Sequence, residues 1–266
     1  FWLRRNEPDV FEKTFKYLLV EDYLIWKMTD EFVAEGSLLC STCYWNIVTK
    51  KWWDEMLEFI GIDETKLPNI RESGEVVGNL KREAAEQLGL TTNTIVTTGG
   101  LDQACGTIGV GNVKPGIFTE NIGAALAICA IQERLTFDPK RRMPVHYFVT
   151  PNTYMFHTFT TGGMALRWFR DSFCNEEINV AKLAGVSPYW LIDKEVERIS
   201  PGSEGLVMLP HLQGAMAPEA NPNAKGVFFG ITLAHNKTHF LRSIMEAIAC
   251  AIMRNIEVLE DLGIKV

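Results

Sequence analysis

The hydrophobic pattern of the chain changes from mainly helical to mainly extended near Pro115-Gly116. Before this point, apolar residues recur at helical spacing through residues 9–33, and short helices that end at glycines are predicted for residues 54–60 and 83–88. A chain of 266 residues is long enough to form two compact units. The sequence therefore predicts an α/β protein with a domain boundary near Pro115-Gly116.

Strand-like segments dominate after this boundary. Residues 117–122 and 125–131 are apolar runs that flank Gly123-Ala124, which is the pattern of a β-hairpin with a tight turn. The later pattern predicts strands at residues 147–149, 155–159 and 205–210, and helices at residues 164–173 and 237–262.

Charge and cysteine content exclude several classes of partner. The formal net charge is −7 and no basic stripe occurs, so nucleic acid is not an expected partner. No apolar run reaches the roughly 18 residues that a membrane helix needs, so no membrane span is expected. The six cysteines are scattered, and Cys40 and Cys43 have no second pair at metal-ligand spacing. This usage is typical of reduced thiols in a cytoplasmic protein without a metal site.

A carboxylate at a predicted strand-to-helix turn is the first candidate for chemistry. The β-branched run at residues 94–98 predicts a buried strand, which leads through Gly99-Gly100 to a helix that opens at Asp102. The plainer interpretation of Asp102 is a helix N-cap. The alternative is a ligand site, because paired glycines allow close approach and strand ends are where α/β folds bind ligands. Spacing alone leaves both interpretations open.

Four segments in this order resemble the FGGY family of carbohydrate kinases. They are Gly99-Gly100-Leu101-Asp102-Gln103-Ala104-Cys105-Gly106 with Lys114-Pro115-Gly116; Gly226 to Ile231 followed by His239 to Glu246; Gly162-Gly163 with Leu166 to Asp171; and Tyr17-Leu18-Leu19 with Asp22-Tyr23-Leu24 and Thr29 to Phe32. The second of these matches the family's C-terminal signature at every restricted position. Together the four segments cover nearly the whole chain.

The resemblance implies an α/β fold of two actin-like, ribonuclease-H-like ATPase domains, each only partly present. Residues 1–116 would form the second half of the N-terminal, sugar-binding domain, and residues 117–266 the first half of the C-terminal, nucleotide-binding domain. The chain has no initiator methionine, and the family's Asp-x-Gly-Thr phosphate loop and Gly-rich adenine loop do not occur in it. We therefore expect a central fragment of a longer protein that is inactive alone. Its exposed sheet edges would favour association, for example as a homodimer.

The resemblance also implies the roles of individual residues. Asp102 matches the catalytic base, which accepts a proton from the sugar hydroxyl that attacks the γ-phosphate of ATP. Gln103 matches a position that contacts the sugar. The implied cofactors are ATP and Mg²⁺, with Gly123, Ala124, Gly163 and Arg167 at the positions that border the nucleotide. The implied partner is a small-molecule sugar substrate: a ketose, polyol or aldonic acid of about five or six carbons, with a xylulose-like pentulose as the first expectation.

One departure from the family pattern keeps a second function open. The family usually has Gly-Thr at the hairpin turn, whereas this chain has Gly123-Ala124. Loss of the threonine hydroxyl removes one hydrogen-bond donor to phosphate, worth about 0.5–1.5 kcal/mol. The alternative is therefore a non-catalytic, carbohydrate-binding or regulatory relative. A third class, the actin- or chaperone-like ATPases, is disfavoured because it has no need for a sugar base.

His235 and His239 are expected to be surface or capping residues.

Overall fold

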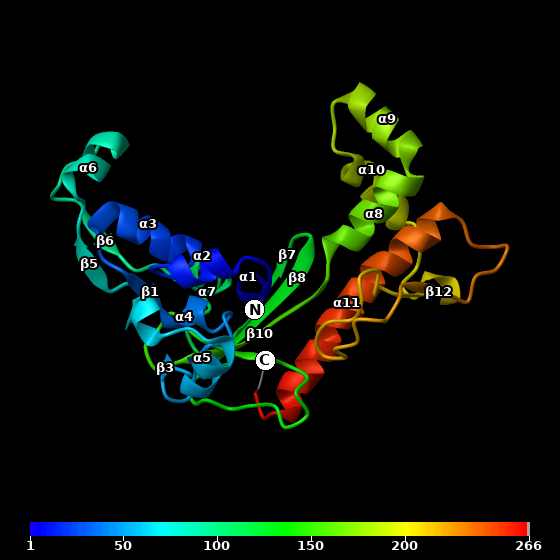
Figure 1. The fold of residues 1–266 in the computed structure, drawn as a ribbon. Helices are drawn as coiled ribbons and strands as arrows, with labels where there is room; N and C mark the ends of the chain where they lie inside the picture. Colours follow the sequence, from blue (N-terminus) through cyan, green and yellow to red (C-terminus); the bar gives the residue numbers. More distant parts are fainter. Residues whose placement is uncertain (265–266) are drawn as a thin grey trace. The chain divides into compact units, whose positions relative to one another are not determined.

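The structure, a computed structural model, describes residues 1–264 in two compact units (Figure 1). Unit 1 comprises Phe1–Val113, Ile131–Thr136 and Val145–Met155, and unit 2 comprises Lys114–Ala130, Phe137–Pro144 and Phe156–Val266. The chain first leaves unit 1 after Val113 and then returns to it twice. The predicted division into residues 1–116 and 117–266 stays a prediction about family domains.

Unit 1 is built from short helices and short strands. Its helices are α1 (Trp2–Asn6), α2 (Pro8–Lys13), α3 (Val20–Thr29), α4 (Gly36–Leu39), α5 (Asp54–Ile60), α6 (Arg82–Leu88), α7 (Asp102–Gly109) and the 3-10 helix η1 (Glu64–Lys66). Its strands are β1 (Val33–Glu35), β2 (Trp45–Asn46), β3 (Lys51–Trp52), β4 (Asn69–Arg71), β5 (Val76–Asn79), β6 (Ile95–Thr97) and β9 (Val145–Tyr147). β1 and β4 pair in parallel, whereas β2 with β3 and β5 with β6 form antiparallel pairs.

The hydrophobic core of unit 1 fixes α3 against the strands. Ile25 of α3 packs in one buried cluster with Val33 of β1, Val96 of β6 and Leu80. The helix begins where the Asp22 carboxylate accepts the Leu19 N–H at 2.9 Å, and burial raises the pKa of Asp22 to about 6. α3 therefore positions β1, which leads directly into α4, and β6, which leads directly into the loop before α7.

Unit 2 holds the remaining helices and most of one larger sheet. Its helices are α8 (Gly163–Phe173), α9 (Asn175–Ala184), α10 (Pro188–Val196), α11 (Lys237–Asp261) and the 3-10 helix η2 (Ser203–Gly205), and its strands are β7 (Phe118–Ile122), β11 (Val207–Leu209) and β12 (Val227–Phe229). β8 (Ala125–Gln132) and β10 (Tyr154–Thr161) each have residues in both units. The four-stranded sheet has the order β7-β8-β10-β9, and β11 pairs antiparallel with β12.

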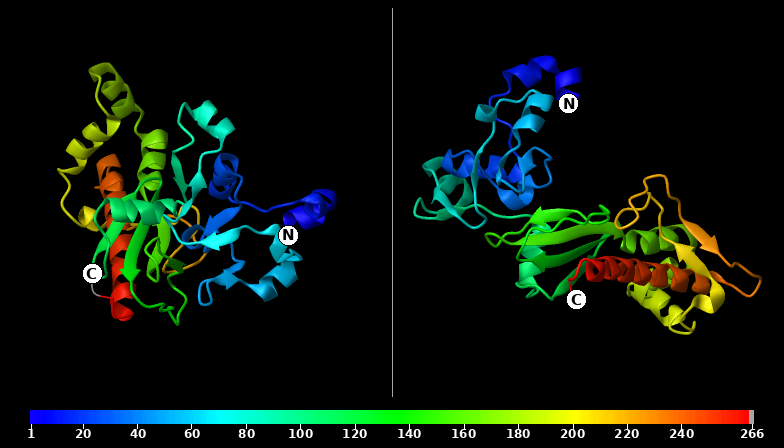
Figure 2. Two further views of the ribbon diagram at one scale, coloured as in Figure 1. Left: turned by 90° about the vertical axis from the view of Figure 1, so that its left-hand side faces the viewer. Right: turned by 90° about the horizontal axis from the view of Figure 1, so that it is seen from below.

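α11 is the main helix covering the sheet of unit 2, and Figure 2 shows it running beside the strands. Leu126 and Ile128 of β8 share a buried cluster with Phe169 of α8 and with Leu241 and Ile244 of α11. These residues recur at helical spacing in α8 and α11 and alternate in β8, as a helix packed on a sheet requires. Within residues 1–264, none of the helices combines the length and the apolar character needed to cross a membrane.

The structure confirms most predicted elements and corrects three. The strand predicted at residues 147–149 is β9 at Val145–Tyr147, and the strand predicted as buried at residues 94–98 is β6, in which only Val96 is buried. The hairpin around Gly123-Ala124 forms with Ile122 paired to Leu126. The prediction of helix throughout residues 9–33 is wrong, because α2 ends at Lys13 and α3 does not begin until Val20. Between them the Tyr17 N–H donates to the Lys66 carbonyl at 2.9 Å, so pairing with a distant segment overrides the local helical pattern.

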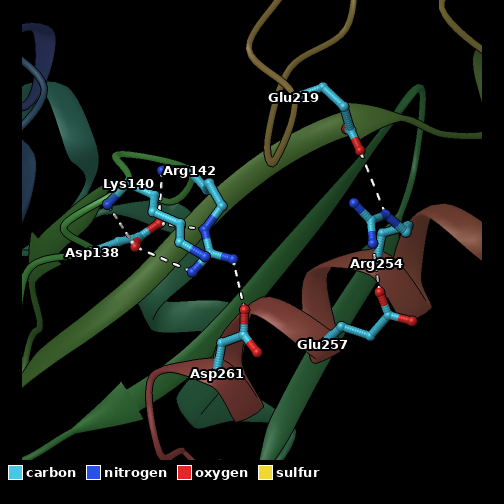
Figure 3. Close-up of polar contacts among 7 residues, drawn as sticks. All are labelled: Asp138, Lys140, Arg142, Glu219, Arg254, Glu257 and Asp261. Carbon is cyan, nitrogen blue, oxygen red and sulfur yellow. Dashed lines mark hydrogen bonds and ion pairs between the residues drawn. The ribbon is translucent and has the colours of Figure 1, made fainter.

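Arg142 fastens a long loop of unit 2 to the end of α11 (Figure 3). The Asp138 carboxylate is buried and accepts the backbone N–H of Arg142 at 2.8 Å and its Nε–H at 2.9 Å. Arg142 Nη1 also donates to Asp261 at 2.8 Å, which places a cation beside the C-terminus of the helix. A second group in Figure 3, Arg254 with Glu219 at 3.7 Å and Glu257 at 2.7 Å, is largely exposed.

We predict that Asp138→Asn destabilises the protein by about 1–3 kcal/mol, because Arg142 and the loop lose charge-assisted hydrogen bonds. Urea denaturation of the full-length protein that contains this chain measures the change. Glu219→Gln is the control, and it should have little effect because exposed ion pairs contribute little. Equal destabilisation by the two variants would contradict the prediction.

The same pair predicts a pH dependence of stability. Hydrogen bonds from Arg142 lower the pKa of Asp138 from 3.8 to about 2. Because the folded-state pKa is the lower one, the stabilisation is complete above the unfolded pKa and is lost as the pH falls through the folded value. Wild-type protein should therefore lose stability between about pH 4 and pH 2 more steeply than Asp138→Asn. Parallel pH profiles would contradict this assignment.

Candidate functional site

Asp102 is the first residue of α7 and points away from the packed interior. The N-cap residue of the helix is Leu101, and Asp102 Oδ1 accepts the N–H of Gln103, the next residue, at 2.7 Å. The side chain of Asp102 is exposed. The N-cap interpretation of Asp102 is therefore wrong, and its carboxylate is left free to face a ligand.

The paired glycines before Asp102 are required by close packing. A Cβ on Gly100 would collide with Val149 Cγ1 and lie 3.2 Å from Cys105 Sγ. A Cβ on Gly99 would lie 3.0 Å from Oε1 of Glu21. A side chain at residue 100 would push the loop away from Val149, whereas one at residue 99 would displace the Glu21 carboxylate.

Side chains from two earlier segments hold the loop that carries Asp102. Glu21 Oε1 accepts the Gly99 N–H at 2.9 Å, and Ser37 Oγ accepts the Leu101 N–H at 2.8 Å. Burial raises the pKa of Glu21, and the hydrogen bond from Gly99 partly offsets this increase. Glu21 of α3 therefore holds one end of the loop, and Ser37 of α4 holds the other. β1 lies between these two helices in the sequence.

A pocket of about 820 Å³ opens beside Asp102, which is within the range of small-molecule sites. Its lining residues are Leu19, Val20, Glu21, Leu38, Ser41, Thr42, Tyr44, Gly100 and Asp102. The lining surface is mainly apolar, and two carboxylates and three hydroxyls are its polar groups, which can hydrogen-bond a ligand. Gln103 is half-buried and is not among these lining residues, so the described geometry gives its predicted sugar contact no support.

Sequence reasoning did not identify Glu21, Ser37, Ser41, Thr42 or Tyr44 as site residues. Ser41 and Thr42 lie between Cys40 and Cys43, and Glu21 lies in a segment that resembles the family, but neither pattern marked these residues themselves. Glu21, Ser41, Thr42 and Tyr44 line the pocket, whereas Ser37 is buried and contacts the loop after β6. No local signal in the sequence could have found them.

The predicted nucleotide residues form a second arrangement, within unit 2. The Gly163 N–H donates to the Gly123 carbonyl at 2.9 Å, and the Met164 N–H donates to the Ala124 carbonyl at 3.0 Å. The first N–H groups of α8 are therefore occupied by the hairpin turn. Ala124 is exposed at the tip of the hairpin, and no hydrogen bond among the described residues uses its N–H.

Arg167 lies on the exposed surface of α8, one turn after Gly163. Its Nε is 3.6 Å from the carboxylate of Asp171, and its side chain is 69% exposed, so this weak ion pair leaves the guanidinium accessible. The structure thus brings Gly123 and Ala124 to the start of α8 at Gly163, and Arg167 follows one turn later on the same helix. The relation of this group to Asp102 stays a prediction.

The histidines and cysteines behave as structural residues in the part of the chain that is described. His239 Nδ1 is 3.2 Å from the Asn236 N–H in the cap of α11, as expected for a capping residue. None of the six cysteines, all within the described residues, forms a disulfide, and these residues hold no group of three or more His, Cys, Asp or Glu side chains that could bind a metal ion.

Comparison with known proteins gives consistent results over both units. Models of the FGGY family of carbohydrate kinases match residues 1–109 with the N-terminal domain and residues 130–266 with the C-terminal domain. The chain is 33% identical over 265 residues to the xylulose kinase of Bacillus subtilis, covering 98% of this chain and 51% of that protein. It is 32% identical over 248 residues to the gluconokinase of Bacillus licheniformis, covering 93% of this chain and 48% of that protein.

Solved structures agree with this result. A xylulose kinase of Brucella ovis matches with a TM-score of 0.86 at 27% identity, covering 100% of this chain and 52% of that one. A ligand-bound xylulose kinase of Lactobacillus acidophilus matches with a TM-score of 0.85 at 26% identity, covering 97% of this chain and 51% of that one. The predicted fold class is confirmed, and the chain spans about half the length of the relatives it matches.

We predict that Gly162→Ala destabilises the protein by about 1–3 kcal/mol, because its Cβ would lie 2.5 Å from the Leu126 nitrogen and would separate the hairpin from α8. Thermal denaturation of the full-length protein measures the loss. Gly123→Ala is the matched control in the same hairpin, since its Cβ would meet nothing closer than the Ala125 carbonyl at 3.8 Å. If both variants melt like wild type, the turn is not held in this way.

Proposed function

The chain belongs to the FGGY family of carbohydrate kinases, and from this premise we propose that the protein containing it phosphorylates a sugar or polyol hydroxyl with ATP. The observation that carries the proposal is Asp102. It is an exposed carboxylate at the start of a helix, and it lines a largely apolar pocket that also carries three hydroxyl side chains. A base at such a position can reach a bound hydroxyl without crossing packed protein.

In the proposed reaction, Asp102 orients the acceptor hydroxyl and takes its proton. The hydroxyl oxygen forms a bond to the γ-phosphorus while the bond from that phosphorus to the bridging oxygen breaks, and ADP leaves. The proton passes to the Asp102 carboxylate as the new P–O bond forms. A carboxylate of ordinary basicity is sufficient, because the hydroxyl becomes acidic late in the reaction and positioning supplies much of the rate.

The hairpin turn and α8 are the proposed neighbours of the nucleotide. The Ala124 N–H at the tip can donate to a phosphate oxygen, and Arg167 supplies an accessible positive charge. Bound Mg²⁺ would neutralise phosphate charge during transfer. Because Ala124 replaces a threonine, the turn offers only backbone donors to the phosphate.

We predict that Asp102→Asn lowers kcat by about 10²–10⁴-fold, because the amide cannot accept the proton. A coupled ADP-release assay on the full-length protein measures kcat, and calorimetry should find ATP binding retained. Asp54→Asn is a matched control, since Asp54 is also an exposed first residue of a helix but lies outside the pocket. It should retain wild-type kcat. Near wild-type turnover by Asp102→Asn would remove Asp102 from the base role.

The described part of the pocket favours a neutral substrate. Its only titratable lining residues other than Tyr44 are the carboxylates Glu21 and Asp102, and no lysine or arginine of the described residues lines it. A substrate carboxylate placed here would be repelled, and a repulsion of about 1.4 kcal/mol corresponds to a tenfold difference in binding. We therefore propose a ketose or polyol, such as a xylulose-like pentulose, over an aldonic acid.

We predict that kcat/KM of the full-length protein is at least about tenfold higher for xylulose than for gluconate. Glu21→Gln should narrow this ratio by raising the value for gluconate, since one repelling charge is removed. Steady-state kinetics with both substrates and both proteins provide the measurement. A preference of the wild-type protein for gluconate would contradict the neutral-substrate proposal and leave the kinase proposal standing.

A further inference from the structure

We propose that Ser37, held in place by the buried carboxylate of Glu35, is a positioning residue for Asp102. This inference rests on the proposed role of Asp102 as the base. Ser37 belongs to α4 and is fully buried, so its hydroxyl cannot contact a substrate. It acts on the reaction only through the peptide that leads into α7.

Ser37 forms the middle of a hydrogen-bonded chain that ends one residue before Asp102. Its Oγ donates to Glu35 Oε1 at 2.7 Å and accepts the Leu101 N–H at 2.8 Å. Leu101 is the N-cap residue of α7, and no side chain caps this helix. A side chain from a segment 64 residues earlier therefore holds the peptide that enters the helix.

Glu35 sets the direction of these hydrogen bonds. A carboxylate only accepts, so the Ser37 hydroxyl must give its single proton to Glu35 and turn its lone pairs to Leu101. Glu35 is itself fixed, because it also accepts the backbone N–H groups of Ser37 at 2.8 Å and Leu38 at 2.7 Å. The fourth donor to Glu35 is the hydroxyl of Ser73, which lies 2.5 Å from Oε2.

The loop needs such a tether because of its glycines. Gly99 and Gly100 leave the backbone before Asp102 with more accessible conformations than any other residue pair would. Glu21 fixes the Gly99 N–H at one end, and Ser37 fixes the Leu101 N–H at the other. Removing the Ser37 hydroxyl frees the end nearer to Asp102. A displacement of about 1 Å at a reacting group is enough to lower the rate by about 100-fold.

The experiment compares two serines that donate to the same carboxylate, in the full-length protein. Ser37→Ala breaks the link to Leu101, and we expect kcat to fall about 10–100-fold with KM for ATP changed by less than about twofold. Ser73→Ala removes one donor to Glu35 but leaves the link to Leu101 intact. It should keep kcat within about twofold of wild type while losing similar thermal stability.

A double variant separates positioning from general damage. If Ser37 acts through Asp102, then Ser37→Ala lowers the single-turnover rate constant by less than about twofold when Asp102 is already asparagine. A further 10–100-fold loss on that background would overturn the inference, as would equal kcat for Ser37→Ala and Ser73→Ala. Those results leave the base role of Asp102 standing. Wild-type turnover by Asp102→Asn alone would instead overturn the base role and this inference together.

Discussion

The backbone between Gly99 and Asp102 has to be held by side chains from elsewhere in the chain. Two adjacent glycines permit the close approach of Val149 and Glu21, but they also leave the peptide without conformational preference. The structure supplies the missing constraint through N–H groups: Glu21 accepts from Gly99 and Ser37 accepts from Leu101. The position of the Asp102 carboxylate therefore depends on α3 and α4 as well as on α7.

The hairpin in unit 2 solves a comparable problem with backbone groups alone. Gly162 and Gly163 allow the turn at Gly123-Ala124 to lie directly on the start of α8, and the carbonyls of the turn accept the first N–H groups of the helix. A helix N-terminus is commonly an anion site, but here two of its donors are already satisfied. Any phosphate recognition by this group must therefore use the exposed tip, where Ala124 lies, and charges such as Arg167. The side chain at residue 124 therefore determines whether the tip offers phosphate a hydroxyl donor in addition to the backbone N–H.

How much of this could be predicted from the sequence depends on whether the determining contacts are local. The hairpin around Gly123-Ala124, the helix α11 and the strand before Gly99 follow from periodicity and glycine placement, and all three are present. The prediction of continuous helix through residues 9–33 is wrong, because the Tyr17 N–H donates to the Lys66 carbonyl and no local sequence pattern indicates that contact. The same limit applies to the site. The turn marked Asp102 only as a candidate, with a helix cap as the alternative, and its role as base came from the family resemblance. Ser37 acts on Leu101 across 64 residues, and Glu35 acts on that link only through Ser37, so neither residue carries a signal of its own.

The carboxylates around the Asp102 loop are buried or half-buried and accept backbone N–H groups, so they contribute to the geometry of the site. Glu35 and Asp22 are buried with no lysine or arginine partner among the described residues, and burial raises the pKa of both Asp22 and Glu21. Burying a charge without a counter-charge is costly unless hydrogen bonds replace the lost water. Each of these carboxylates accepts backbone N–H groups: Asp22 from Leu19, Glu21 from Gly99, and Glu35 from Ser37 and Leu38. Glu35 also accepts the hydroxyls of Ser37 and Ser73. Apolar residues of similar size would fill the same space at lower cost but could not accept an N–H. The acidic residues therefore fix backbone positions near Asp102 that packing alone would leave free.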